Sequence, residues 1–221
     1  MTILSPLEQS RFNMIEQQIR PWDVLEQAVL ELLAVVKREQ FLPPAQQAFA
    51  FVDMETPLPG GQCMLSPRVE ARALQDLQVQ KHDKVLEVGA GSGYMAALLA
   101  HRAQQVLTLE LVPELVTLAR ANLQKAGIHN VEVRQGDGAK GAAADGPFDV
   151  IVLSGSVAEV PAAILAQLKV GGRLFAVVGQ DPVLRATFIT RTGEAAFGTV
   201  QPWDTDAPRL LNFPEPSAFS F

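Results

Sequence analysis

The sequence Val-Leu-Glu-Val-Gly-Ala-Gly-Ser-Gly-Tyr at residues 85–94 decides the fold of this chain. An apolar run leads here into three alternating glycines, Gly89, Gly91 and Gly93, and then into a stretch of small residues. This pattern is typical of a strand, a tight turn and a helix N-terminus, where glycine lets the backbone close on a nucleotide-like ligand. The first expectation is therefore a cofactor pocket at this turn.

Apolar runs alternate with helical patterns on both sides of the turn. The predicted strands, buried on both faces, are residues 85–88, 106–109, 131–134, 150–153 and 174–178, and the predicted helices are residues 95–102, 113–126 and 161–168. This alternation predicts an α/β fold with a doubly wound, mostly parallel Rossmann-like sheet and helices on both faces. Residues 191–194 predict the turn of a C-terminal antiparallel hairpin, and the Pro-rich tail from Trp203 is expected to be irregular.

The N-terminal third has a different pattern. Asp23 and Glu26 predict a capping box that opens one amphipathic helix over residues 24–36. Prolines and paired glycines in residues 41–67 predict an ordered loop, and Ser66-Pro67 predicts the start of the next helix. We therefore expect residues 1–78 to form a helical and loop segment that packs on the cofactor site of a domain formed by residues 79–221.

Composition limits the class of partner. The chain has 221 residues, 48% of them hydrophobic, and a formal net charge of −6, so we expect a folded globule without general affinity for nucleic acid or anionic membranes. Cys63 is the only cysteine, which excludes an internal disulfide and a thiolate metal cluster. No apolar stretch approaches the ~20 residues of a spanning helix, and no signal-peptide pattern is present. A cytoplasmic location follows as an expectation, and the oligomeric state stays open.

The glycine pattern separates two classes of cofactor. A dinucleotide fingerprint requires glycine at the sixth position of the motif, whereas Gly93 comes one residue too early, which disfavours NAD and FAD. Glu87, two residues before the turn, suits a ligand that carries positive charge and donors better than a diphosphate. S-adenosyl-L-methionine, with its sulfonium and amino groups, fits this description.

Two further acidic residues follow the next predicted strands. Glu110 lies 19 residues after Gly91, where a carboxylate accepts hydrogen bonds from ribose hydroxyls in a doubly wound fold. Asp137, between Gly136 and Gly138, is expected to turn toward the same crevice and to accept from the adenine amino group. Taken singly, these features are typical of a tight turn, a solvated strand end and an Asp-Gly turn. Their recurrence at successive strand ends favours the S-adenosylmethionine site.

With these residues the chain resembles the protein-L-isoaspartate O-methyltransferase family. The resemblance covers roughly residues 14–180 and is carried by residues 85–94, Glu110, and residues 119–123, 136–138, 147–151 and 167–173. More specific to this family are Lys-Arg-Glu-Gln-Phe-Leu-Pro at residues 37–43 and Leu-Pro-Gly-Gly-Gln at residues 58–62. The resemblance implies a class I methyltransferase that uses S-adenosyl-L-methionine to esterify isoaspartyl sites in damaged proteins, the first step of their repair.

The resemblance also implies roles for individual residues. Glu87, Gly89, Gly91 and Gly93 would line the methionine end of the cofactor, Glu110 would hold the ribose, and Asp137 with Gly138 would hold the adenine. The remaining residues predicted to contact the cofactor are Met64, Leu65, Ser92 and Leu111.

The sequence departs from the family at the active-site loop. The family continues from Gly-Gln with Thr-Ile-Ser, whose serine is its active-site residue, whereas this chain has Cys63-Met64-Leu65. Ser66, one position later, is the catalytic candidate, with a helix N-cap as its alternative role. A carboxyl group with a pKa near ~4 is ionised without a base, so a missing hydroxyl need not abolish methyl transfer. The family's Thr-Ala-Ala after its fourth strand is here Ser-Gly-Ser at residues 154–156.

Three functional hypotheses therefore remain. The first is a carboxyl methyltransferase acting on isoaspartyl proteins or peptides. The second keeps the cofactor but changes the acceptor, because Leu65, residues 154–156 and the tail all fall where the acceptor would be selected. The third is a noncatalytic relative that retains the fold.

Overall fold

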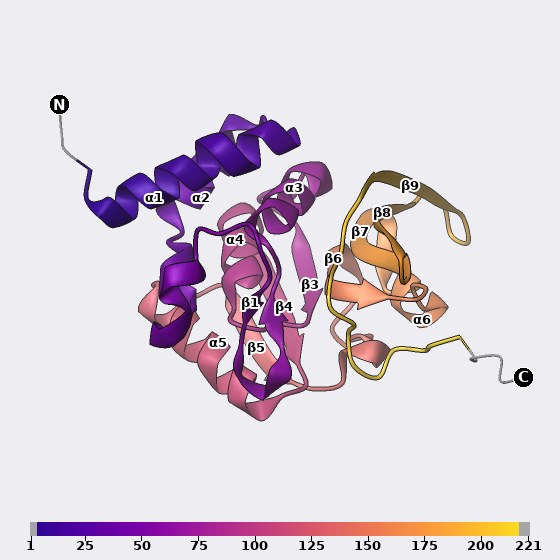
Figure 1. The fold of residues 1–221 in the computed structure, drawn as a ribbon. Coiled ribbons are helices and arrows are strands. Elements are labelled where there is room, and N and C mark those ends of the chain that lie inside the picture. Colours follow the sequence, from indigo (N-terminus) through magenta and orange to yellow (C-terminus); the bar gives the residue numbers. More distant parts are fainter. Residues whose placement is uncertain (1–3, 217–221) are drawn as a thin grey trace, which may run out of the picture.

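A seven-stranded sheet forms the centre of the computed structural model, which describes residues 4–216. Its strand order is β5-β4-β3-β6-β7-β8-β9. The first five of these strands are mutually parallel, and β8 and β9 are added antiparallel, as the sequence predicts (Figure 1). The strands are β3 (Lys84–Val88), β4 (Gln105–Glu110), β5 (Val131–Gln135), β6 (Phe148–Val157), β7 (Leu168–Gln180), β8 (Val183–Arg191) and β9 (Phe197–Asp204).

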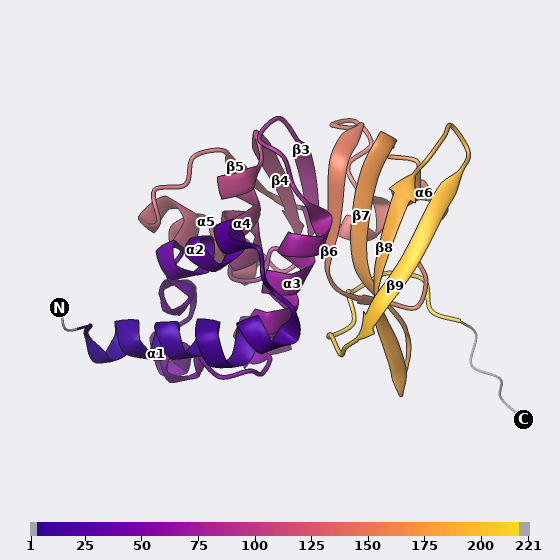
Figure 2. The ribbon, with the colours of Figure 1, turned by 90° about the horizontal axis from the view of Figure 1, so that it is seen from above.

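Helices cover the two faces of this sheet unequally. One face packs against α3 (Pro67–Leu77), α4 (Tyr94–Arg102) and α5 (Pro113–Lys125), behind which lie α1 (Pro6–Met14) and α2 (Gln27–Val35). Figure 2 shows α1, α2, α4 and α5 gathered on one side. The other face buries residues such as Leu86 and Ile151 against the single turn of α6 (Ala162–Leu165) and against Phe213 of the tail. The second face therefore depends partly on the C-terminal segment for its cover.

Two predicted helices are shorter than the periodicity indicates. The helix predicted over residues 24–36 begins at Gln27, and the Asp23 capping box is wrong, because Asp23 adopts a left-handed conformation (φ 60°) after a short helical turn. No side chain caps this helix; instead, the Oε1 of Gln75 on α3 accepts from the backbone N–H groups of Leu25 and Glu26, just before the helix, at 2.7 and 2.9 Å. The helix predicted over residues 161–168 is confined to α6, because β7 begins at Leu168.

The segment between Phe41 and Pro67 is an ordered loop, as predicted. It contains short helical turns at Pro44–Phe49 and Pro59–Gly61, and its two-residue strands β1 (Thr56–Pro57) and β2 (Cys63–Met64) pair with each other. This loop and the helices before it pack into the same core as α4 and α5. A division of the chain into two parts at residue 78 stays a prediction.

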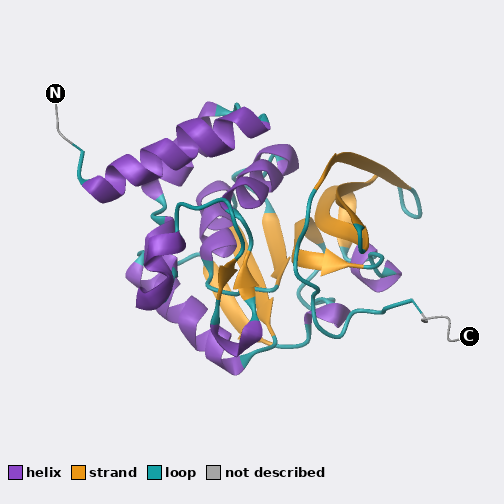
Figure 3. Ribbon diagram, in the orientation of Figure 1, coloured by secondary structure: helices purple, strands orange, loops and turns teal. Residues whose placement is uncertain are grey.

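The tail is more ordered than its composition indicates. Trp203 lies in β9, and its ring packs on Phe175 with a centroid separation of 6.2 Å. The chain beyond β9 forms no further helix up to residue 216, yet it returns past β6 (Figure 3) and buries Phe213. The expectation of an irregular tail is wrong for Trp203 and Asp204, which lie in β9, and holds for residues 205–216, whose path is nevertheless fixed by apolar side chains and backbone hydrogen bonds. Within residues 4–216 no helix combines the length and the apolar character needed to cross a membrane.

Candidate functional site

The glycine turn after β3 has the conformation that the sequence predicts. Gly89, Gly91 and Gly93 have φ values of 92°, 52° and 86°, a region that residues with a side chain rarely adopt. Gly93 is the N-cap of α4, and a Cβ atom there would lie 3.3 Å from Ala119 of α5. The turn therefore lets α4 start directly behind the end of β3.

A pocket, here the outer pocket, opens beside this turn. Its walls come from the carboxyl ends of β3 and β4, from the loop after β5 and from the tail. The predicted cofactor residues that line it are Gly89, Gly91, Glu110, Leu111 and Gly138. Residues that lie far apart in the sequence thus meet at one edge of the sheet, as expected for the ligand crevice of a parallel α/β sheet.

Glu110 fixes the turn to the end of β4. Its two carboxylate oxygens accept hydrogen bonds from the backbone N–H groups of Gly91 and Val112, both at 2.9 Å, and the residue is 6% exposed. A carboxylate has about four acceptor sites, so two remain for hydroxyl groups of a ligand in the outer pocket. Glu110 can therefore position the backbone and bind a ligand at the same time.

The Gly136-Asp137-Gly138 bend reaches the pocket through its glycines. A Cβ atom at Gly138 would clash with Val88 of β3, so only glycine fits there. Gly136 and Gly138 line the outer pocket, whereas the Asp137 carboxylate accepts from the N–H of Ala139 at 3.1 Å and caps a short helical turn. Contact between Asp137 and a ligand stays a prediction.

A smaller pocket, here the inner pocket, adjoins the outer one. Both pockets share Cys63, Gly89, Gly91 and Ser154 in their walls. The other residues that line the inner pocket are Met64, Leu65, Glu70, Glu87, Ala90, Ser92, Tyr94 and Met95. The two pockets together form a crevice that runs from the end of β5 past the glycine turn to α3.

Glu87 lies fully buried in the wall of the inner pocket. Its carboxyl group accepts hydrogen bonds from the hydroxyls of Thr108 and Ser154, at 2.6 and 2.8 Å. Burial raises the pKa of Glu87 to about 8, although the two hydroxyl donors lower it. Nearby Glu70 and Glu110 raise it further, so the site favours a positive group that would share the pocket with Glu87.

Sequence reasoning missed a buried polar cluster on the opposite wall. Arg38 forms an ion pair with Glu70 of α3 and donates to the backbone carbonyl of Leu65 at 2.6 Å. Burial raises the pKa of Glu70 to about 7, even though the Arg38 guanidinium lowers it. The guanidinium also lies 5.1 Å from the centre of the Tyr94 ring. Arg38 and Glu70 are 32 residues apart, so no local motif pairs them.

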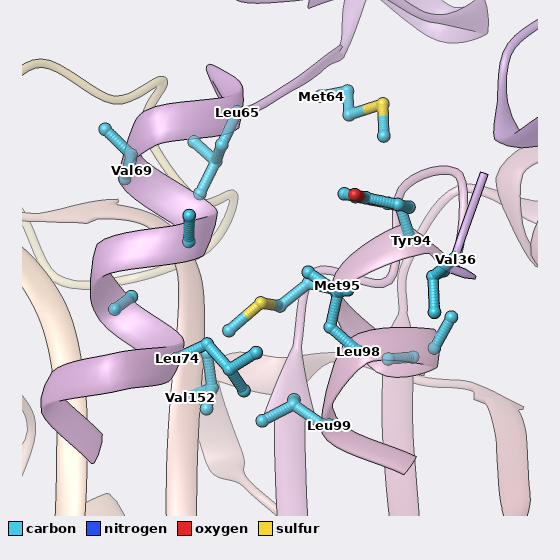
Figure 4. Close-up of a cluster of buried hydrophobic side chains, with 14 of the residues drawn as sticks. Val36, Met64, Leu65, Val69, Leu74, Tyr94, Met95, Leu98, Leu99 and Val152 are labelled. Carbon is cyan, nitrogen blue, oxygen red and sulfur yellow. The ribbon is translucent and has the colours of Figure 1, made fainter. Parts of the chain in front are cut away.

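The loop residues named from the sequence do not all reach the pockets. Met64 and Leu65 line the inner pocket, and Figure 4 shows Met64 near Tyr94 and Leu65 above the first turn of α3. Ser92 also lines it and donates to the Met64 sulfur at 3.6 Å. Ser66 lines neither pocket; it is the N-cap of α3, as its alternative role predicts, although its hydroxyl makes no capping hydrogen bond.

The surroundings of Cys63 and Tyr94 argue against an ionised nucleophile in the inner pocket. Burial and the neighbouring Glu55 carboxylate raise the pKa of Cys63 to about 12, which keeps the thiol protonated at neutral pH. Burial also raises the pKa of Tyr94, whose hydroxyl is enclosed and has no hydrogen-bond partner within the described part of the chain. The inner pocket therefore offers neutral donors and two acidic groups rather than a nucleophile.

The tail lies at the site, where the second hypothesis expects the acceptor to be selected, although sequence reasoning named none of its residues. Residues 208–211 and Phe213 line the outer pocket. The only local signal is the three apolar residues Leu210, Leu211 and Phe213 among prolines, which does not reveal what they pack against. Long-range packing alone brings this segment to the site.

The crevice fits a cofactor of the S-adenosylmethionine type better than a dinucleotide. Its walls carry the carboxyl groups of Glu70, Glu87 and Glu110, which supply no positive charge for a diphosphate. They also present the acceptor oxygens that a sulfonium nucleoside with hydroxyl and amino groups requires. The observed walls therefore agree with the cofactor class predicted from the glycine spacing.

Comparison with known proteins gives consistent results. The family model for protein-L-isoaspartate(D-aspartate) O-methyltransferase matches residues 9–200. A protein-L-isoaspartate O-methyltransferase from Koribacter versatilis is 41% identical over 82% of this chain and 81% of its own length. One from Methanoculleus marisnigri is 38% identical over 79% of each chain.

The fold has a counterpart among solved structures. A Plasmodium falciparum protein assigned as a protein-L-isoaspartate O-methyltransferase, crystallised with S-adenosyl-L-homocysteine, superposes with a TM-score of 0.77. The superposition covers 93% of this chain and 98% of that protein, at 18% sequence identity. At this level of identity the comparison establishes a shared fold.

Proposed function

This chain belongs to the protein-L-isoaspartate(D-aspartate) O-methyltransferase family, and from that premise we propose that it methylates L-isoaspartyl residues of damaged proteins and peptides. The methyl donor is S-adenosyl-L-methionine, and the acceptor is the α-carboxylate of the isoaspartyl residue. The observation that carries the proposal is the identity of about two residues in five over four-fifths of the chain with named enzymes of this activity. The acidic crevice at the carboxyl ends of β3 and β4 supports it.

We assign the two pockets to the two ends of the cofactor. The inner pocket, with Glu87 and the glycine turn, would hold the methionine part together with Met64, Leu65 and Ser92. In the outer pocket Glu110 would accept from the ribose hydroxyls, and Leu111, Asp137 and Gly138 would surround the adenine. When bound, the cofactor supplies an electrophilic methyl group on its sulfonium sulfur.

The residues of the chain have mainly to align the acceptor and exclude water. A carboxylate with a pKa near ~4 is already ionised at neutral pH, so the transfer needs no general base. Leu65 is 5% exposed and gives the inner pocket an apolar wall, while Arg38 holds the backbone carbonyl of Leu65 in place. Such alignment and desolvation supply much of the rate in a two-reactant transfer. Catalysis by Ser66 stays a prediction that requires the loop to shift.

The test is methylation of a defined peptide. Purified protein with methyl-labelled S-adenosylmethionine should place a base-labile methyl ester on an isoaspartyl peptide and none on the same peptide with a normal aspartyl residue. The Koribacter versatilis relative is a suitable positive control. The proposal fails if that enzyme labels the peptide while this chain does not.

A different acceptor is the second candidate, favoured by one observation. The position of the family's active-site serine is occupied by Leu65, which is apolar and lines the inner pocket. A screen of small acids and cell extract with labelled cofactor would detect such an acceptor. Binding of S-adenosylhomocysteine without any turnover would instead favour a noncatalytic role.

We also propose a cytoplasmic location and protein or peptide substrates. The support is limited to composition: Cys63 is free, so the fold needs no oxidising compartment. Fractionation of cells followed by detection of the protein would test the location.

A further inference from the structure

We propose that Arg209 binds the carboxylate of the methyl acceptor, which makes the chain after β9 a specificity element of the site. Residues 205–216 are called the strap below. The inference rests on the proposed function, because it concerns the acceptor of the same reaction. It assigns a role to a segment that lies beyond residue 200, where the match to the family model ends.

Backbone hydrogen bonds fix the strap to the carboxyl end of β6. The N–H of Ser156 donates to the carbonyl of Pro208 at 2.7 Å, and the N–H of Leu210 donates to the carbonyl of Ser156 at 2.9 Å. These bonds form a parallel bridge between Ser156 and Arg209 (Figure 1, yellow). Arg209 is therefore held at a strand end that borders the crevice.

Two glycines allow the strap to lie close to the end of β6 and to the glycine turn. A Cβ atom at Gly155 would stand 2.8 Å from Leu210 Cγ and 2.9 Å from the Pro208 carbonyl, so a side chain at residue 155 would displace the strap. A Cβ atom at Gly89 would lie 3.0 Å from Leu210 Cδ2. The strap thus lies directly against the glycine turn, and it is anchored at its far end by the buried Phe213.

The charges around the crevice give Arg209 a distinct role. Among the described residues that line the two pockets, Arg209 is the only basic one; Arg38 lies behind the wall of the inner pocket and is already paired with Glu70. A guanidinium at the edge of the crevice attracts an anionic acceptor. A guanidinium also matches the planar geometry of a carboxylate, to which it can donate two parallel hydrogen bonds.

The contacts that Arg209 makes in this structure are weak enough for a ligand to replace them. Its Nε lies 3.1 Å from a carboxylate oxygen of Glu215, and its Nη1 lies 3.5 Å from the Ser156 hydroxyl. The side chains of Arg209 and Glu215 are 34% and 51% exposed, so this ion pair is weak and exchangeable. We infer that Glu215 holds the guanidinium in place until the acceptor carboxylate replaces it.

The experiment compares a carboxylate with its neutral counterpart. Protein saturated with S-adenosylhomocysteine is titrated with an isoaspartyl peptide and with the same peptide carrying an α-carboxamide. The wild-type protein should prefer the carboxylate by about tenfold, the size of one hydrogen bond to a charged group. Arg209→Gln should reduce this preference to less than about twofold, and Arg209→Lys should keep part of it.

Arg185→Gln is the matched control. Arg185 forms a similar exposed ion pair, with Asp204 at 3.2 Å, but it lines neither pocket. This variant should keep the wild-type preference. The dissociation constant of S-adenosylhomocysteine, measured for every variant, should stay within twofold, since Arg209 is assigned to the acceptor and not to the cofactor.

The outcomes separate this inference from the proposed function. If Arg209→Gln keeps the preference, or loses cofactor binding instead, the inference is overturned while methylation by the wild-type protein still supports the function. If the wild-type protein prefers the carboxylate through Arg209 but transfers no methyl group, the function fails and the inference stands. If the wild-type protein neither binds nor methylates the isoaspartyl peptide, both are wrong.

Discussion

At the scale of single residues, Glu87 shows how a buried acid prepares a site for a cation. Its carboxyl group lies between the hydroxyls of Thr108 and Ser154 in a wall without solvent, and its pKa is raised to about 8. A protonated Glu87 costs little to bury, whereas a cofactor with a positive group favours the ionised form. Binding of such a cofactor should therefore release a proton near neutral pH.

The raised pKa of Glu87 predicts how stability depends on pH. Its pKa is about 8 in the folded state and near 4.5 in the unfolded state, so the folded protein binds more protons between these values. The contribution of Glu87 to the free energy of unfolding is therefore fully present below pH ~4.5 and is lost as the pH rises toward 8. Its slope is at most about 1.4 kcal/mol per pH unit.

Urea unfolding at several pH values between 5.5 and 8 would measure this slope for the cofactor-free protein. Glu70, whose pKa is about 7, contributes in the same direction. Glu87→Gln should flatten the slope without removing it, because Glu70 still titrates. An unchanged slope in Glu87→Gln would show that Glu87 is ionised throughout this range.

Glu110 supports a prediction about cofactor affinity. Glu110→Ala removes the acceptor proposed for the ribose and also frees the N–H groups of Gly91 and Val112. We expect the binding of S-adenosylhomocysteine to weaken by ~1.5–3 kcal/mol, the range for hydrogen bonds to a charged group. Isothermal titration calorimetry measures this change. Glu110→Gln, which keeps one acceptor oxygen, should lose less affinity, and an unchanged dissociation constant in Glu110→Ala would remove Glu110 from the site.

At the scale of secondary-structure elements, the parallel strands and the glycine turn could be predicted because their determinants are local. Apolar runs such as residues 150–153 mark strands buried on both faces, and Gly93 marks the start of α4. Sites at the carboxyl ends of neighbouring strands then follow from topology, which is why Glu87 and Glu110 could be placed together. For these residues, local sequence patterns are enough to predict the structure.

The features that could not be predicted depend on partners distant in the sequence. Asp23 carries a good capping signal, but it adopts a left-handed conformation, and a glutamine some fifty residues away bonds the backbone around it. The contact between Arg38 and Glu70 depends on the packing of α3 against the loop before it. The position of the strap at the crevice depends on its pairing with β6. Periodicity and capping rules describe neighbours along the chain and contain no information about such contacts.

Gln75 gives a test of these long-range hydrogen bonds. Its side chain accepts from the N–H groups of Leu25 and Glu26 and donates to the carbonyl of Asp23. Gln75→Ala should lower the free energy of unfolding by about 1–2 kcal/mol, because these backbone groups lose their side-chain partner. Urea denaturation measures it against Gln124→Ala, an exposed position on α5. Equal stability of the two variants would mean that these hydrogen bonds contribute nothing.

At the scale of the whole molecule, the unequal cover of the sheet links the strap to the site. Five helices lie on one side, whereas the other side relies on α6 and on Phe213 to cover residues such as Leu86 and Val88. The same strap forms a wall of the outer pocket. Protection of the second face and closure of the cofactor crevice are therefore performed by one segment, so occupation of the crevice should stabilise the strap.

Proteolysis can report on this coupling, because Arg209 is the only lysine or arginine after Arg191. Trypsin can cut the strap at the Arg209–Leu210 bond only when the bridge to Ser156 opens, since the backbone on both sides of that bond is paired with β6. Mass spectrometry would follow release of the peptide that begins at Leu210. Saturating S-adenosylhomocysteine should slow the cut several-fold, because a ligand held by the closed strap disfavours its opening.

Phe213→Ala supplies the opposite change. Removal of the buried ring should loosen the strap and speed the same cut, whereas Phe12→Ala, at an exposed position on α1, should leave the rate unchanged. If the cofactor product binds, as calorimetry would show, and yet the rate of cutting at Arg209 stays the same, then the strap is a fixed cover of the second face. In that case the crevice must be closed by the loop at residues 58–65, since that loop supplies the opposite wall of the pockets.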